Sequence, residues 1–236
     1  MIFQRDSLGR VVCNIRTPTN GPKGPNEEIG TAIFIEKNNE AFLLTAAHVA
    51  NNINDQSYAV LSNKSGAPEM VLLKDLLGGA KFEKHSQADL AKVKIKITAS
   101  NSAYLTERCF PHNQIDMKDD LISKDIELTT IGFPMGLGSS GAKFTPLTFR
   151  TFVSGQIISL PRFDNKVVCD FIILETPSTG GYSGGPLFDL GYVISGAMTT
   201  RKENTLLHGI VHGTISDQTG GKLAAITPCK YLNGWL

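Results

Sequence analysis

The sequence predicts an all-β protein, and three observations support that class. Short apolar stretches with the alternation of strands recur along the 236 residues. Turn-forming residues, including 23 glycines and 11 prolines, separate these stretches. Almost no segment sustains the 3.6-residue period of an amphipathic helix. Many short strands divided by turns are typical of all-β proteins.

The first half of the chain is expected to fold as a series of short strands. Its most regular feature is a hairpin around the turn at 37–40. Residues 17–28 are rich in proline and glycine and are interpreted as a loop. A short helical turn at 46–54 carries His48. The expected strands are 10–15, 30–36, 41–45, 57–61, 69–73 and 90–97.

The second half continues in the same way. A loop of glycine and proline at 133–138 follows one strand directly. Residues 144–159 are expected to form a strand and a hairpin. The last residues, 227–236, are interpreted as a short C-terminal helix or cap. Further strands are expected at 126–132, 167–174, 192–198, 206–215 and 222–226.

Composition narrows the partners and the compartment. The formal net charge is +1 and no basic stripe is present, so we expect no nucleic-acid partner. No apolar run approaches the roughly 20 residues of a membrane span, and the N-terminus turns polar too soon for a secretory signal. The four cysteines form no C-x-x-C pair. We therefore expect a cytoplasmic protein with free thiols, no membrane association, no metal and no cofactor.

One stretch carries the strongest chemical signal, GGYSGGPLF at 180–188. Its glycines permit the cramped turn conformations that lift Ser183 out of the chain. They also leave the backbone N–H groups of Gly181 and Ser183 free to point at a common spot. Two such donors form an oxyanion hole, which stabilises the charge that develops in acyl transfer. Taken alone, the stretch could equally be a glycine-rich hairpin with a solvent-facing serine.

Two further stretches favour the catalytic interpretation. FLLTAAHV at 42–49 places His48 just past an apolar strand, and ADLAKVKI at 88–95 places Asp89 at the head of an alternating strand. With the three stretches in the order His, Asp, Ser, the chain resembles the trypsin/chymotrypsin-like serine proteases. It is most similar to the bacterial HtrA (Deg) branch, which IGFPMGLG at 131–138 and VSGQII at 153–158 also resemble.

The resemblance implies a fold and a division of labour. The fold is two six-stranded antiparallel β-barrels with the active site in the cleft between them. Residues 1–115 would form the N-terminal barrel and residues 116–236 the C-terminal barrel. Ser183 would be the nucleophile, His48 its general base, and Asp89 the group that orients the imidazole. The amides of Gly181 and Ser183 would bind the oxyanion of a protein or peptide substrate.

The resemblance also indicates specificity and control. The base of the primary pocket would be Pro177, with Ser178 and Thr179 beside it, so cleavage after an uncharged residue is expected. The opposite wall is assigned to Met198, Thr199 and Thr200. Tyr182 stands where secreted relatives carry the acidic residue that a new N-terminus pairs with. Activity is therefore expected to depend on ordering of the loop at 180–181, on a regulatory protein partner, or on neither.

Three alternative interpretations compete with this assignment. GYSGG at 181–185 also fits the nucleophile elbow of α/β-hydrolases, but the exit GGPLF disfavours the helix that this elbow requires. His208 and His212 are four apart, as zinc ligands on a helix can be, but their neighbours indicate a strand, so both are interpreted as structural. The remaining alternative is a catalytically silent trypsin-like domain that binds peptides or scaffolds a partner.

Overall fold

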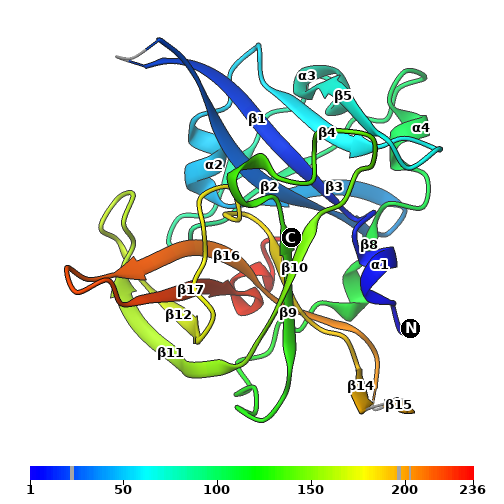
Figure 1. Cartoon of the computed structure of the whole chain (residues 1–236). Helices are drawn as coiled ribbons and strands as arrows, with labels where there is room; N and C mark the ends of the chain where they lie inside the picture. Colours follow the sequence, from blue (N-terminus) through cyan, green and yellow to red (C-terminus); the bar gives the residue numbers. More distant parts are fainter. Residues whose placement is uncertain (22–23, 196–197, 202) are drawn as a thin grey trace.

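The computed structural model describes the whole chain except residues 22–23, 196–197 and 202. Two large sheets and one small hairpin make up the described part (Figure 1). Both large sheets are built mainly from antiparallel strands, which confirms the all-β class. Within the described residues, no helix is both long and apolar enough to cross a membrane.

The first sheet lies at the top of Figure 1 and has eight strands in the described part of the chain. Its order is β5-β4-β1-β2-β3-β7-β6, with β8 paired in parallel to β2. The turn between β2 and β3 has positive φ at Asn38 and Asn39, which suits a tight hairpin. The strands are β1 (Val12–Gly21), β2 (Gly24–Lys37), β3 (Glu40–Thr45), β4 (Tyr58–Ser62), β5 (Pro68–Leu72), β6 (Glu83–Lys84), β7 (Ala91–Lys94) and β8 (Phe110–Pro111).

The second sheet has seven strands among the described residues, in the order β10-β9-β13-β16-β17-β12-β11. A separate hairpin of β14 (Tyr192–Ser195) and β15 (Met198–Arg201) lies at the far end of the molecule (Figure 1). The strands of the sheet are β9 (Leu128–Gly132), β10 (Leu147–Thr151), β11 (Val153–Pro161), β12 (Val168–Leu174), β13 (Pro186–Asp189), β16 (Leu206–Ser216) and β17 (Lys222–Pro228).

Helices are short and serve as connections and caps. The helical turn expected near His48 is confirmed as α2, and the expected C-terminal cap is a 3-10 turn, η3. The helices are α1 (Arg5–Leu8), α2 (Ala47–Asn51), α3 (Leu73–Leu76) and α4 (Ser102–Leu105), and the 3-10 turns are η1 (His112–Gln114), η2 (Pro134–Gly136) and η3 (Cys229–Leu232).

Two details differ from the sequence-based expectations. In the described residues the sheets hold eight and seven strands rather than six each, and in the first sheet the two-residue strands β6 and β8 make up the difference. The loop expected at 17–28 is wrong, since β1 and β2 pair through it from Thr17 with Glu28 to Gly21 with Gly24. Prolines are tolerated there because β4 pairs with β1 only up to Arg16, so the outer part of the hairpin is an edge.

The core is continuous between the sheets. One cluster of buried residues joins Ile33, Leu44 and Phe110 of the first sheet to Ile131 and Phe188 of the second. Each of these side chains is fully buried. Burying a side chain of this size contributes about 1.5–3 kcal/mol. The shared core holds the two sheets in a fixed relation, so residues from both can form one site.

Candidate active site

A short helix directly after β3 carries His48. β3 pairs with β7 so that Thr45 lies opposite Ala91, which brings Asp89, two residues before Ala91, beside the start of α2. The backbone N–H of His48 donates to Asp89 Oδ1 at 3.0 Å, and His48 Nδ1 donates to Asp89 Oδ2 at 2.7 Å. The two bonds fix both the main chain and the ring of His48.

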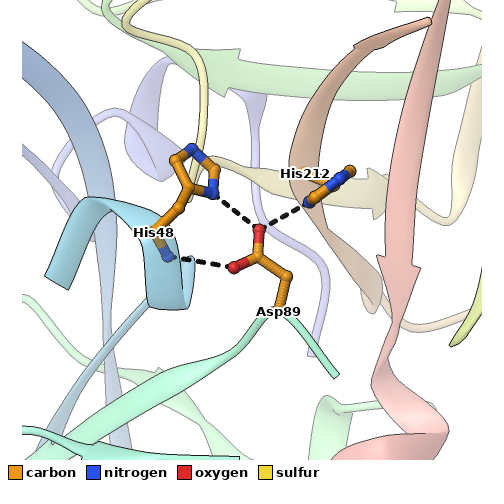
Figure 2. A group of neighbouring side chains, drawn as sticks. All are labelled: His48, Asp89 and His212. Carbon is orange, nitrogen blue, oxygen red and sulfur yellow. Dashed lines mark hydrogen bonds and ion pairs between the residues drawn. The ribbon is translucent and has the colours of Figure 1, made fainter. Parts of the chain in front are cut away.

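Asp89 is completely buried and accepts hydrogen bonds from more than one side (Figure 2). Besides the two donors of His48, His212 Nδ1 donates to Oδ2 at 2.6 Å and Arg162 Nη2 donates to Oδ1 at 3.1 Å. Burial raises the pKa of Asp89, but the hydrogen bonds from His212 and His48 outweigh burial and hold the pKa well below its usual range. Asp89 is therefore a carboxylate, and the imidazole nitrogens facing it carry protons.

Metal binding by this group must be considered, because His48, Asp89 and His212 place potential ligand atoms within 4.8 Å of one another. The two Nδ1–Oδ2 distances are 2.7 and 2.6 Å. Neighbouring ligands of a tetrahedral zinc ion, with bonds of about 2.0–2.1 Å, would lie about 3.3 Å apart. The observed distances are those of hydrogen bonds, so the cluster is arranged to share protons rather than to hold a metal.

Ser183 stands on the turn between β12 and β13. Its neighbour Gly184 has φ +86°, and a Cβ at that position would lie 2.0 Å from the carbonyl oxygen of Thr31, so only glycine fits. The Thr31 N–H donates to the carbonyl of Ser183 at 2.8 Å, which ties the turn to the first sheet. Ser183 Oγ donates to the backbone carbonyl of His212 at 3.1 Å. His212 therefore contacts both Asp89 and Ser183.

The two peptide groups before Tyr182 are each held by a hydrogen bond. The carbonyl of Gly180 accepts from the Met135 N–H at 2.7 Å, and the carbonyl of Gly181 accepts from Thr31 Oγ1 at 2.8 Å. An N–H points opposite to the carbonyl of its own trans peptide, so the Gly181 N–H faces away from Met135. In the hydrogen bonds of the described residues, neither Gly181 nor Ser183 uses its N–H to donate to the protein. Both N–H groups are free for a ligand.

Two spaces flank the serine turn. A cleft of about 170 Å³ is lined by His48, Gly181 and Ser183 together with Glu28. A much smaller cavity, about 10 Å³, is lined by uncharged residues: Thr130, Phe149, Thr151, Leu174, Thr176, Pro177, Ser178, Tyr182, Val211, Ala224 and Ile226. Ser178, one of the lining residues, accepts a hydrogen bond through its carbonyl from Thr214 Oγ1 at 2.7 Å. The backbone carbonyl of Thr179, the third residue expected here, accepts from the Tyr182 N–H.

The wall assigned to Met198, Thr199 and Thr200 is wrong. These residues are exposed on β15, whose strand partner among the described residues is β14, and Thr199 lines a different cavity with Ile2. The chain inserts the β14–β15 hairpin before β16, and β16 takes the place beside the serine turn. The Gly184 N–H donates to the carbonyl of Val211 on β16 at 2.8 Å.

Sequence reasoning missed two members of the site. The sequence-based interpretation makes His212 structural and gives Arg162 no role. His212 lies at a β-bulge, where β16 changes register against β17 between Val211 and Gly213. Bulges re-aim side chains and are frequent next to active sites. Arg162, on the turn after β11, reaches Asp89 with only 3% of its side chain exposed. Neither feature has a local sequence signal.

Known proteins offer independent comparisons. A family model described as a trypsin-like peptidase domain matches residues 30–194. Among solved structures, the HtrA-type protease AlgW with a tripeptide is 18% identical, with TM-score 0.59, and the match covers 97% of this chain and 60% of AlgW. The active form of the Rv3671c protease from M. tuberculosis is 16% identical, with TM-score 0.59, covering 97% of this chain and 80% of that one.

More distant structures share the same fold. Human heparin binding protein is 13% identical, with TM-score 0.57, covering 98% of this chain and 92% of that one. No curated protein matches the sequence significantly. The chain spans 60% of the HtrA-type protease it matches, so likeness in fold does not extend to that whole protein's partners.

Proposed function

The chain belongs to the trypsin-like peptidase domain family, with the chymotrypsin-like fold of a serine protease, and from this premise we propose that it is an endopeptidase acting through His48, Asp89 and Ser183. One observation carries the proposal. The buried Asp89 carboxylate fixes His48, and His48 lines the same cleft as Ser183 and Gly181. A base, a serine hydroxyl and free backbone donors then share one space, as acyl transfer requires.

The reaction would begin with rotation of the Ser183 hydroxyl from the His212 carbonyl toward His48. Catalytic hydrogen bonds are often long or misaligned before substrate binds. Ser183 Oγ then attacks the scissile carbonyl carbon as His48 Nε2 takes its proton, and Asp89 stabilises the resulting imidazolium. His48 returns the proton to the leaving amine, the acyl-enzyme forms, and water activated by His48 releases the acid.

The oxyanion of the tetrahedral intermediate would lie against the N–H groups of Gly181 and Ser183. One donor of this kind contributes about 2.7–4 kcal/mol to transition-state stabilisation. The anchoring of Gly180 by the Met135 N–H supports a preset orientation for this hole. Met135 itself is exposed, with φ 54°, so a regulatory partner would act by holding or releasing this turn.

The substrate class follows from the cavity beside Pro177. Its lining is uncharged and its volume is about 10 Å³. A charged side chain would find no counter-charge there, and a bulky one no room. We therefore assign cleavage after a small uncharged residue, within an extended peptide or protein chain.

The test is labelling with a fluorophosphonate probe, which reacts with activated serines. Labelling is expected in the native protein and in Ser102→Ala, an exposed serine outside the site. It is expected to vanish in Ser183→Ala and His48→Ala. A folded native protein that stays unlabelled, yet binds peptides, would replace the enzyme with the catalytically silent binding module.

A further inference from the structure

A second imidazole shares the carboxylate that holds His48. His212 comes from β16 in the second sheet, and its Nδ1 lies 2.6 Å from Asp89 Oδ2, the same oxygen that His48 Nδ1 reaches at 2.7 Å (Figure 2). The two rings meet edge to face with centroids 5.8 Å apart. One carboxylate oxygen therefore contacts two histidines, one from the helix α2 that follows β3 and one from β16 in the second sheet.

The His212 ring is held tightly in this position. It packs between Phe163, at a centroid distance of 4.4 Å, and Phe171, at 4.8 Å. Only 6% of its side chain is exposed. Because Asp89 is ionised, His212 donates from Nδ1, and its tautomer is fixed by the same rule that fixes His48.

Arg162 donates a hydrogen bond to the other oxygen of the Asp89 carboxylate. Its Nη2 lies 3.1 Å from Asp89 Oδ1, and its Nε and Nη2 contact the two oxygens of Asp164 at 2.9 and 2.6 Å. Its Nη1 donates to the carbonyl of Gln87 at 3.0 Å. With neutral imidazoles, two carboxylates and one guanidinium leave one excess negative charge. That charge is neutralised when His48 becomes an imidazolium.

We propose that His212 and Arg162 are positioning residues for the reaction, and this inference rests on the proposed roles of His48 and Asp89. His212 holds Oδ2 and Arg162 holds Oδ1, so rotation of the carboxylate away from His48 would break both contacts. Rotation would remove the acceptor that orients the His48 Nδ1–H and would leave the imidazolium without its counter-charge. The carboxylate is thus set by the second sheet, although Asp89 belongs to the first.

The experiment compares two replacements of His212 that separate shape from hydrogen bonding. His212→Asn keeps an N–H on the atom attached to Cγ, where Nδ1 stands, whereas His212→Phe keeps the ring and loses the donor. His208, on the same strand with its Nδ1 3.1 Å from Asp116 Oδ2, supplies the matched controls His208→Asn and His208→Phe. Steady-state kcat and KM on a peptide substrate, and NMR of ¹⁵N-labelled histidines, are measured for all five proteins.

A positioning role has a defined signature. The native protein should show two low-field Nδ1–H signals. His212→Phe should shift the remaining His48 signal and lower kcat by about ten- to a hundredfold, the loss expected for a hydrogen bond to a charged group, with KM unchanged. His212→Asn should restore most of kcat, and both His208 variants should keep native kcat.

Equal kcat in His212→Asn and His212→Phe would overturn the proposal, as would a His48 signal that neither variant moves. The NMR reading does not depend on turnover. If native protein lacks peptidase activity but its His48 signal shifts in His212→Phe, the proposed function fails while the positioning contact stands. If His212→Phe does not fold, two other results still test the contact. Absence of the two low-field signals in the native protein would contradict it. A loss of kcat in His212→Asn, which keeps the N–H donor, would also contradict it.

Discussion

Two histidines of β16 show the same arrangement in two different settings. His208 and His212 each lie where β16 changes register against a neighbour, at a bulge opposite β13 and opposite β17 respectively. Each directs Nδ1 to a carboxylate, at 3.1 Å for Asp116 and 2.6 Å for Asp89. The local chemistry is the same at both sites. A bulge breaks the alternation of side-chain direction along β16, and the redirected histidine contacts a carboxylate.

The difference lies in what surrounds each carboxylate. The Asp116 side chain is 19% exposed, and the hydrogen bond from His208 is the main reason that its pKa is lowered. Asp89 is fully buried and also meets His48 and Arg162. A histidine–carboxylate pair alone therefore does not indicate catalysis. It becomes a candidate catalytic group only where further side chains contact the carboxylate, as His48 and Arg162 contact Asp89.

The sharpest way to break this comparison is to neutralise each carboxylate in turn. Asp89→Asn is expected to lower kcat by about 10⁴-fold, because an amide cannot enforce the tautomer or stabilise the imidazolium. Asp116→Asn should leave kcat within about twofold. The measurement is kcat on a peptide substrate, with the fluorophosphonate labelling rate as a check. A comparable loss in both variants would mean that the two histidine–carboxylate sites of β16 are not functionally distinct.

The cations beside the two carboxylates should differ in their contribution to stability. Arg162→Met removes the guanidinium partner of the buried Asp89 and of the half-buried Asp164 and is expected to cost about 3–5 kcal/mol in the free energy of unfolding. Lys118, whose backbone N–H and charge face Asp116, has a side chain 78% exposed, and Lys118→Met should change stability by less than about 0.5 kcal/mol. Urea unfolding measures both. A small loss for Arg162→Met would show that the buried ion pair is readily replaced.

Low pH should reveal the same difference between Asp89 and Asp116, with a smaller effect on the free energy of unfolding. The folded-state pKa of Asp89 lies below its ordinary value of 3.8, so its ionised form stabilises the fold above that pH, and this contribution is lost as pH falls toward the folded-state pKa. A buried carboxylate of this kind contributes on the order of 2 kcal/mol. Unfolding free energy measured from pH 5 to pH 2 should fall less steeply in Asp89→Asn than in Asp116→Asn. Identical slopes would contradict the assignment.

The buried thiols give the finest comparison. Burial raises the pKa of Cys169, near Asp89, to about 11, and raises that of Cys229, near Asp116, well above its usual range. Both thiols should resist iodoacetamide at pH 8 in the native protein and react in urea, with mass spectrometry as the readout. As pH is raised, Cys169 should react before Cys229. Rapid labelling of either thiol at pH 8 would indicate local opening around that cysteine.

Local sequence patterns were informative wherever the chemistry is carried by neighbours in the chain. Small residues before His48 mark a strand passing into a helical turn, and the glycines around Ser183 mark a turn that presses against Thr31. The alternation after Asp89 marks β7, whose pairing with β3 brings that aspartate to His48. Each prediction needed only strand pairing between short, recognisable segments.

The rest of the site depends on contacts that no local pattern records. His212 meets Asp89 across 123 positions and Arg162 meets it across 73. A bulge depends on the register of two strands rather than on the residue it displaces. The residues Met198–Thr200 were misplaced for a related reason, because an inserted hairpin separates β13 from the strand that lies beside the serine turn.

The crossing of the chain ends has a consequence for how the molecule unfolds. Near the start, the Phe3 N–H donates to Thr205 Oγ1 at 2.9 Å, in the C-terminal half. Near the end, Trp235 accepts the Lys92 ammonium over its ring at 4.6 Å, in the N-terminal half. Each half of the chain is thus contacted by a terminal segment of the other half. Neither half can therefore unfold without disrupting the other. Denaturation should be a single cooperative transition, and the two halves made as separate polypeptides should gain structure only when mixed.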